Sequence, residues 1–298
     1  MESRNKSATL PSNAALDILG TDLLIRCASY LDAHGLVQLG RTSARYGIPQ
    51  AGLKRSLANE AARQRFRQSV TDKEKGCLPK CNDESDIGLY RALELMRQPL
   101  GFDELVGGGF SPQEHPSRFA YTGRCGVWST ALSGHVMRGG KHFVEFAITH
   151  ERNFPHIMLG VIRPVSLTKG INLEADWEGM VHPVMVSSSF KPAVSERLRS
   201  QRTAKWGGSN VHCCAYHSNS GRCCWTDWEN EWGLGQERLP GGRGTMGLLL
   251  NLDEGTLSVS ENGGRLGMIK GGLNGQYCWF VSVYSSCTIS MSKSRAPN

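Results

Sequence analysis

The sequence predicts a mainly β protein, an antiparallel two-sheet sandwich preceded by a small α-helical module. The first observation is a series of short apolar or alternating segments, separated by turn residues, after about residue 117. Such a series is typical of antiparallel sandwiches and barrels. The second is Asn262-Gly263 between two short apolar segments, a strong hairpin signal because both central turn positions need positive φ. The third is a helical spacing of leucines near the start of the chain.

Each expected strand follows from its own pattern. Apolar residues two apart place Val144, Phe146 and Ile148 on one face of a strand that begins at His142. Asn274-Gly275 marks a further turn. The other expected strands are Ile157–Ile162, Thr245–Leu252, Thr256–Ser260, Tyr277–Tyr284 and Thr288–Met291.

The spacing before residue 70 is helical. Apolar residues three or four apart share one face of a helix. That face holds Leu16, Leu19, Leu23, Cys27 and Leu31, and it is widened by Leu24 and Tyr30. A second short helix opens at Leu36 and Leu39 and ends at Gly47 and Pro49, and a third helical stretch is Leu53–Val70.

These patterns divide the chain into five parts. We expect a flexible tail at 1–12, a helical module at 13–70, a linker with one helix at 71–116, the sandwich at 117–293 and a tail at 294–298. The linker is predicted because 71–88 is polar and contains Gly and Pro.

The sandwich contains a long insert, Asn172–His217. The middle of the insert, Lys191–Lys205, holds five Lys/Arg and one Glu. A solvated loop explains this composition.

Composition narrows the function classes. The chain has 298 residues, of which 39% are hydrophobic and 20% charged, as in ordinary globular proteins. The net charge of +7 is modest, and the dense basic patch with aromatics that nucleic-acid binding favours is absent. No stretch approaches the ~20 apolar residues of a membrane helix, and the first residues lack the apolar core of a signal peptide. We therefore expect a cytoplasmic or nuclear protein that binds neither nucleic acid nor membranes.

The ten cysteines are expected to be free, because the chain is long and shows no export signal. Several belong to a cluster of zinc-ligand residue types, which is His212, Cys213, Cys214, His217, Cys223 and Cys224. Zinc needs four converging ligands, but neighbouring residues of a strand point to opposite faces, and no C-x₂-C pair is present. We expect buried thiols, no metal and no other cofactor.

Catalytic patterns are also missing from the sequence. Two groups of carboxylates alternate with Trp or Gly, which an exposed polar edge explains better than an acid/base pair. They are Glu174, Asp176 and Glu178, and Asp227, Glu229 and Glu231. There is no G-x-S-x-G elbow, and no Lys-Ser/Thr follows the Gly-rich segments. We expect the chain to supply no catalytic residue and not to be an enzyme.

The segment Gly244–Met291 resembles the C-terminal half of a SPRY domain. The matching residues are Gly247, Leu252, Asp253, Gly255 to Ser258, Asn262, Gly263, Leu266, Gly267, Tyr277 and Ser282. Gly140–Phe146 and Leu159–Val161 resemble two strands of the first half, whereas Thr245 and Cys278 depart from the usual acidic residue and proline. The resemblance implies a concanavalin-like sandwich that binds a peptide or protein through loops at one end.

The same resemblance implies where the ligand would bind. The relevant positions follow the last matching strand, follow Val161 and precede the first strands, and tryptophans add to them because they are enriched at binding hot spots. The expected ligand-binding residues are Arg124, Trp128, Arg163, Pro164, Trp225, Val283, Tyr284 and Ser285.

The helical start resembles an F-box in the stretches Leu19–Leu24 and Tyr30–Leu39. Gly20 replaces the proline of the motif, and the tryptophan of its last helix is absent, with Tyr46 in the neighbourhood. An F-box implies that a Skp-type adaptor binds. The residues expected to contact the adaptor are Leu19, Leu23, Leu24, Leu31 and Leu36. The alternative is a helical cap on the sandwich.

These resemblances imply a protein–protein interaction module. It would be the substrate-recognition adaptor of a Skp/cullin-type ubiquitin ligase, holding a target peptide or protein on the SPRY loops. Two alternatives remain open, a SPRY scaffold protein without a ubiquitin role and a lectin-like carbohydrate binder.

Overall fold

The computed structural model describes residues 19–49, 52, 54–76, 78, 85–123, 126–150, 156–228, 233–234, 239–240 and 244–294. The chain forms two compact units, one of residues 1–74 and 81–94 and one of residues 75–80 and 95–298. Within the described ranges, no helix has both the length and the apolar character that crossing a bilayer requires.

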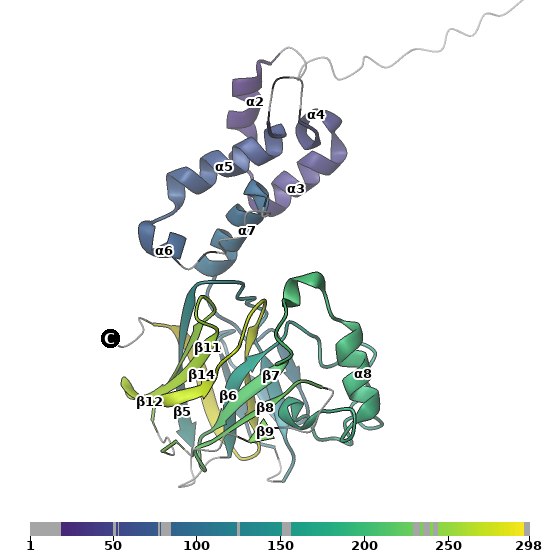
Figure 1. Ribbon diagram of the computed structural model, residues 1–298, viewed down its shortest axis with the longest axis vertical. Coiled ribbons are helices and arrows are strands. Elements are labelled where there is room, and N and C mark those ends of the chain that lie inside the picture. Colours follow the sequence, from purple (N-terminus) through teal and green to yellow (C-terminus); the bar gives the residue numbers. More distant parts are fainter. Residues whose placement is uncertain are drawn as a thin grey trace, which may run out of the picture. The chain divides into compact units, whose positions relative to one another are not determined.

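The first unit is helical (Figure 1). Its described helices, the last of which continues into the second unit, are α2 (Thr21–Ala28), α3 (Ala33–Thr42), α4 (Ala44–Gly47), α5 (Leu57–Ser69), α6 (Asp72–Gly76) and α7 (Asp86–Arg97). Asp32 begins α3, because its carboxylate accepts a hydrogen bond from the Gly35 amide. Ser56 begins α5 in the same way, by accepting from the Asn59 amide. The third helix therefore starts at Leu57 rather than at Leu53.

The apolar core of the helical unit comes from α2, α3, α4, α5 and α7. The buried side chains are Leu24, Ile25, Ala28, Ala33, Leu36, Tyr46, Leu57, Ala61, Ala62 and Tyr90. On α2 the buried face is therefore Leu24, Ile25 and Ala28, whereas Leu23 is 53% exposed. Of the face expected from the leucine spacing, Leu23, Cys27 and Leu31 are exposed, whereas Leu24 is buried and Leu19 packs against the core.

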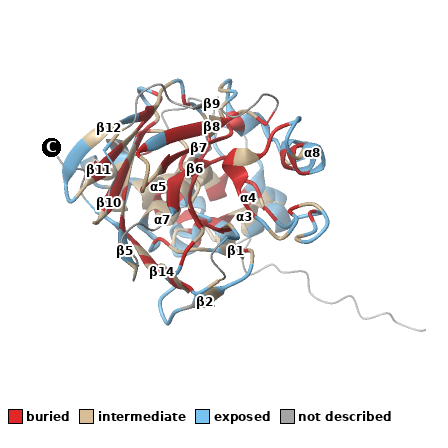
Figure 2. Cartoon of the chain, turned by 90° about the horizontal axis from the view of Figure 1, so that it is seen from below, coloured by how far each residue is buried: buried red, intermediate tan, exposed pale blue. Residues whose placement is uncertain are grey.

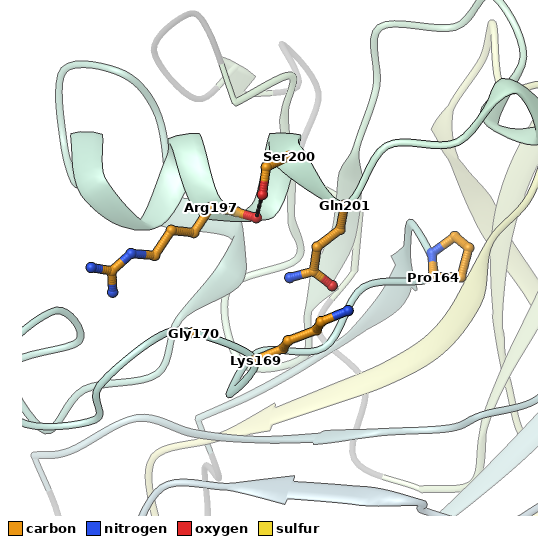
Figure 3. A pocket seen from close by; sticks show the side chains of 6 residues that line it. All are labelled: Pro164, Lys169, Gly170, Arg197, Ser200 and Gln201. Carbon is orange, nitrogen blue, oxygen red and sulfur yellow. Dashed lines mark hydrogen bonds between the residues drawn. The ribbon is translucent and has the colours of Figure 1, made fainter.

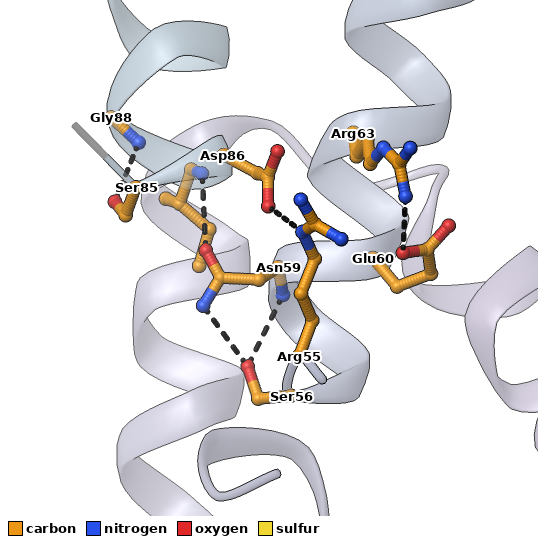
Figure 4. Close-up of polar contacts among 9 residues, drawn as sticks. Arg55, Ser56, Asn59, Glu60, Arg63, Ser85, Asp86 and Gly88 are labelled. Carbon is orange, nitrogen blue, oxygen red and sulfur yellow. Dashed lines mark hydrogen bonds and ion pairs between the residues drawn. The ribbon is translucent and has the colours of Figure 1, made fainter. Parts of the chain in front are cut away.

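Polar contacts join the beginnings of α5 and α7 (Figure 4). The Arg55 Nε donates to Asp86 Oδ2 at 2.7 Å, and the Asn59 Oδ1 accepts from the Ile87 amide at 3.3 Å. Exposed ion pairs contribute little by themselves, but the two contacts together set the register between these helices.

The second unit is a sandwich of two antiparallel sheets, with seven strands each in the part of the chain that the structure describes. The first sheet has the order β1 (Glu104–Val106), β4 (Ser129–Leu132), β13 (Cys278–Val283), β6 (Ile157–Ile162), β7 (Cys213–His217), β8 (Arg222–Thr226) and β9 (Gly233–Leu234). The second has the order β12 (Gly264–Lys270), β11 (Thr256–Glu261), β10 (Met246–Asn251), β5 (Lys141–His150), β14 (Cys287–Lys293), β3 (Arg118–Tyr121) and β2 (Phe110–Pro112). The fold class expected from the sequence is confirmed.

Strand alternation fills the space between the sheets. Val144 and Phe146 of β5 face Leu159 and Val161 of β6 in one continuous core. The predicted hairpin is present as well, because Asn262 and Gly263 join β11 to β12 with φ of 48° and 81°. Two consecutive positive φ angles are the geometry that Asn-Gly favours.

A second core covers the outer face of the first sheet. It contains Met158 and Ile162 of β6 together with Trp177, Trp206 and Leu198 from the segment between β6 and β7. That segment includes α8 (Pro192–Ser200) and two short 3₁₀ helices, Pro183–Met185 and Ala204–Trp206. Figure 2 shows the result, since the ribbons of β6, β7 and β8 are largely in the buried colour. The predicted solvated loop is therefore ordered, with Val194 and Leu198 of α8 buried under its charged residues.

The stretch 71–116, expected to hold one helix, contains more structure. It holds α6, α7, β1 and β2, and the two strands belong to the two sheets. β1 and β2 have three residues each, too few to show alternation, so only their pairing with β4 and β3 defines them.

Truncating Leu198 tests the second core. Leu198→Ala leaves a cavity at a fully buried position and should lower the free energy of unfolding by about 2–5 kcal/mol. Urea denaturation followed by tryptophan fluorescence reports on this unit, because all seven tryptophans follow residue 95. Phe190→Ala is the control, since Phe190 is 56% exposed. Equal losses for both variants would contradict a packed cover.

Candidate functional site

One end of the first sheet gathers side chains from five separate segments. The strand register places them, because Val283 of β13 pairs with Ile157 of β6 and with Ser129 of β4. Trp128 precedes Ser129 and Tyr284 follows Val283, and the Tyr284 amide donates to the His156 carbonyl at 3.1 Å.

Aromatic rings pack against one another at this end. The Trp128 ring centroid lies 5.1 Å from that of Tyr284, 4.6 Å from that of His182 and 6.1 Å from that of His217. His156 completes the group, 5.6 Å from His217 and 5.5 Å from Tyr284. Offset and edge-to-face contacts of this kind stabilise aromatic clusters.

Part of this cluster is accessible. Trp128, His217 and Tyr284 are half-buried and His156 is exposed. Apolar residues flank the cluster in sequence, since Val127 and Met180 are each 38% exposed and the Val181 amide donates to the Trp128 carbonyl. We call Val127, Trp128, His156, Met180, His182, His217 and Tyr284 the Trp128 surface.

Polar atoms within the Trp128 surface are incompletely paired. The His217 Nδ1 lies 2.7 Å from the Ser220 hydroxyl, and the Asn219 amide nitrogen lies 3.0 Å from the His156 Nδ1. Three of the buried side-chain atoms that lack a hydrogen-bond partner among the described residues lie at this end, and these are His217 Nε2, His182 Nδ1 and Asn219 Oδ1. Buried polar groups are normally paired, so these three atoms are exceptions.

Two of the imidazoles are neutral at pH 7. Burial lowers the pKa of His182 to about 4. Burial also lowers the pKa of His217 to about 4, helped by the nearby His156 and Arg222. Desolvation disfavours the charged form of histidine, so the histidines add hydrogen-bonding atoms to the surface and little charge.

Three of the expected ligand-binding residues lie together at this end. Trp128 and Tyr284 form the ring contact described above, and the Ser285 hydroxyl accepts from the His156 amide at 3.1 Å. Val283 is adjacent in sequence but fully buried in the core between the sheets. Its expected role as a contact residue is corrected, because alternation turns its side chain inward.

Arg163 is also buried, and its assignment to ligand binding is corrected. Its Nη1 donates to the carbonyls of Asn274 and Gln276 at 2.8 and 3.1 Å, and its Nη2 donates to the Ser209 carbonyl at 2.8 Å. The guanidinium lies 4.1 Å from the Tyr277 ring centroid, and burial lowers the pKa of Arg163. This side chain ties two loops together inside the sandwich.

The remaining expected contacts lie elsewhere. Pro164 follows the opposite end of β6. Trp225 is a half-buried residue of β8 whose ring lies 4.6 Å from the Lys270 ammonium. Neither joins the Trp128 surface, and Arg124 lies outside the described residues.

The histidines of the surface were missed as ligand contacts. The sequence analysis considered His217 only as a zinc ligand, and it assigned no role to His156 or His182. The register between β6 and β7 pairs His217 with Met158, so strand pairing locates His217 at this end of the sheet. His182 lies beside Trp128 only because of the way the insert between β6 and β7 folds.

The four cysteines of the cluster considered for zinc are built into the two cores. Cys214 and Cys223 belong to the core between the sheets, whereas Cys213 and Cys224 belong to the outer core. Burial raises the pKa of Cys214 to about 12 and that of Cys224 to about 11, so these thiols are protonated at neutral pH. Within the described ranges, no three His, Cys, Asp or Glu side chains are placed to hold a metal ion.

Two of the carboxylates considered for catalysis form ion pairs. Asp176 pairs with Arg197, and Glu178 pairs with Lys191 at 3.0 Å. Glu229 and Glu231 lie outside the described residues.

Of the residues expected to bind an adaptor, some are buried in the helical unit and others are exposed. Leu24 and Leu36 are 1% and 0% exposed, so they stabilise the unit and their expected contact with a partner is corrected. Leu23 is exposed, Leu31 is 38% exposed, and Tyr30 beside it is 78% exposed. Leu19 is half-buried.

No protein-family model and no curated protein matches the chain. Solved structures that are similar to it are SPRY domains. The SPRY domain of human HERC1 is 13% identical, with 66% of this chain and 98% of that chain covered and a TM-score of 0.43. The PSpry domain of TRIM65 is 15% identical, with 67% and 95% covered and a TM-score of 0.42. A human SPRY domain is 11% identical, with 64% and 97% covered and a TM-score of 0.37.

Acid should destabilise the sandwich through His182. Its pKa falls from 6.5 to about 4 on folding, so the neutral form is the one that the fold stabilises. Stability is complete above pH 6.5 and declines as the pH falls towards 4, by about 1.4 kcal/mol per pH unit. Urea titrations at pH 7.5 and 5.5 should show a smaller loss for His182→Gln than for the wild type. Identical losses would contradict a neutral, buried His182.

Proposed function

We propose that the sandwich is a SPRY-type interaction domain that binds a segment of a target protein at the Trp128 surface. The observation that carries the proposal is the contact between the Trp128 and Tyr284 rings, half-exposed at the end of the first sheet. The resemblance of Gly244–Met291 to SPRY domains supports the same conclusion.

The composition of this surface suits protein recognition. Trp and Tyr are enriched at binding hot spots because they bury a large area at low entropic cost. The exposed His156 ring adds a polar group beside the aromatic rings. Trp128 and Tyr284 flank the strands β4 and β13, so little ordering is needed on binding.

We further propose that the helical unit is F-box-like and binds a Skp-type adaptor. Exposed Leu23, Tyr30 and Leu31 supply an apolar contact surface, while Leu24 and Leu36 maintain the core beneath it. In that case the chain is the substrate-recognition adaptor of a Skp/cullin-type ubiquitin ligase in the cytoplasm or nucleus. It catalyses no reaction itself and uses no cofactor.

Removing the aromatic side chains should weaken target binding. Peptides selected from a displayed library on the full chain provide the ligand, and fluorescence anisotropy measures their affinity. Tyr284→Ala and Trp128→Ala should each raise the dissociation constant about 30-fold, as expected for hot-spot residues.

Val127→Glu is a second variant that leaves the core intact, because Val127 is 38% exposed, and Phe190→Ala is the control on another exposed apolar residue. The proposal fails if no peptide is enriched, or if the three surface variants bind like the control.

The adaptor proposal is tested by capture of a purified Skp-type adaptor. The Leu23→Asp, Leu31→Asp double variant should lose binding, because it places charges in the apolar contact surface. Gln68→Asp is the control, since it adds a charge at an exposed position of α5. If the intact chain does not bind the adaptor, the chain is a SPRY scaffold without a ubiquitin role, and target binding at the Trp128 surface is unaffected.

A further inference from the structure

A pocket of about 430 Å³ lies between the turn after β6 and the end of α8 (Figure 3). Its lining residues are Pro164, Lys169, Gly170, Arg197, Ser200 and Gln201. The Trp128 surface lies at the Ile157 end of β6, whereas Pro164 lies just beyond Ile162 at the other end. The pocket is therefore a separate site.

The lining of the pocket is cationic. Lys169 and Arg197 line it and no carboxylate does, and of these two charges the one on Arg197 is paired with Asp176. The surrounding segment 163–212 holds seven Lys/Arg against four Asp/Glu. The Lys169 ammonium has no hydrogen bond or ion pair with any described residue, and its side chain is exposed.

The neighbouring carboxylates are already occupied. One Glu104 oxygen accepts from the Ser166 hydroxyl, the Thr168 amide and the Thr168 hydroxyl at 3.0, 3.1 and 2.8 Å. The Asp176 Oδ2 accepts from the Asn172 amide at 2.7 Å and from Arg197. Arg197 is thus held in place, and Lys169 remains uncompensated.

Lys169 is not required to cap α8. The carbonyls in its last turn are bonded locally, because the Ser200 hydroxyl donates to Arg197 at 2.8 Å, the Gln201 amide to Leu198 at 3.2 Å and the Arg202 amide to Arg199 at 2.9 Å. Lysines near helix ends often serve as such caps. Because these carbonyls already have local donors, capping of α8 does not explain the position of Lys169.

The walls of the pocket are fixed to each other. The Gln201 side chain accepts from the Ser166 amide at 2.8 Å and donates to the Ser166 carbonyl at 2.9 Å. This pair of bonds joins the end of α8 to the turn that carries Lys169. A preformed cationic pocket loses little entropy when an anion binds.

We propose that this pocket binds a carboxylate side chain from an acidic segment of a partner protein. Charge-assisted hydrogen bonds from Lys169 to the carboxylate provide the affinity. The lining side chains carry ammonium, guanidinium, hydroxyl and amide groups beside one proline, whereas the pockets of small apolar ligands are lined mainly by hydrophobic and aromatic side chains. Arg199 and Arg202, adjacent in sequence to the lining residues Ser200 and Gln201, are also exposed, and their positive charges favour a segment with several acidic residues over a single ion.

Backbone amide NMR on the full chain tests this proposal with an acetylated tetraglutamate peptide as the probe. The amides of Gly170, Ser200 and Gln201 should shift and saturate, whereas tetraglutamine should have no effect. Lys169→Glu should raise the dissociation constant about tenfold or more. The control Lys141→Glu makes the same change in net charge at an exposed residue of β5 and should bind like the wild type.

Three outcomes would overturn the proposal. They are no saturable shift at these amides, equal weakening by Lys141→Glu and Lys169→Glu, and saturation by inorganic phosphate without saturation by tetraglutamate. Tyr284→Ala should leave tetraglutamate binding unchanged, so this experiment and the test of the Trp128 surface fail independently.

Discussion

The first sheet is buried on both faces, and much of the rest of the sandwich depends on this constraint. Every residue of β6 and β13 is buried. Ile157, Leu159 and Val161 of β6 point into the core between the sheets, while Met158 and Ile162 point into the outer core. Antiparallel sheets often leave one face in water, but here the outer face is apolar and must be covered. The segment between β6 and β7 supplies that cover with Trp177, Trp206 and Leu198.

The cover determines where a partner can bind. Because α8 and the segments around it cover the outer face of β6 and β7, the two candidate sites lie at the two ends of β6. One end presents Trp128 and Tyr284, with neutral imidazoles beside them. The other end presents the cationic pocket at Lys169. Arg163 links the segment between β6 and β7 to the loop before β13, because its guanidinium donates to the Ser209 carbonyl and to the Asn274 carbonyl. The hydrogen-bond acceptors of this guanidinium among the described residues are carbonyl oxygens, not carboxylates. The two ends therefore offer different chemistry on one rigid framework.

Features set by neighbouring residues agree with the sequence predictions, whereas several features set by contacts between distant segments do not. Asn262-Gly263 was placed correctly because a hairpin turn is decided by two adjacent φ angles. The SPRY resemblance placed Trp128 and Tyr284 among the expected ligand-binding residues, and the rings of these two are in contact. Arg163 was misplaced because the sequence does not show that three carbonyls from distant loops surround its guanidinium. Leu24 and Leu23 were assigned to one helix face, although adjacent residues of a helix differ by about 100°, and packing buried only Leu24.

The sequence by itself determined the fold class, the main strands, the local turns and the helical start, because alternation, helical spacing and turn residues act over a few residues. It did not determine which apolar face of α2 is buried, that the insert is ordered, or that His182 lies beside Trp128. Those features depend on contacts between segments that are far apart in the chain, such as the bond from the Val181 amide to the Trp128 carbonyl. Only tertiary packing selects among such contacts, since each gains its free energy from burial that the whole sandwich creates.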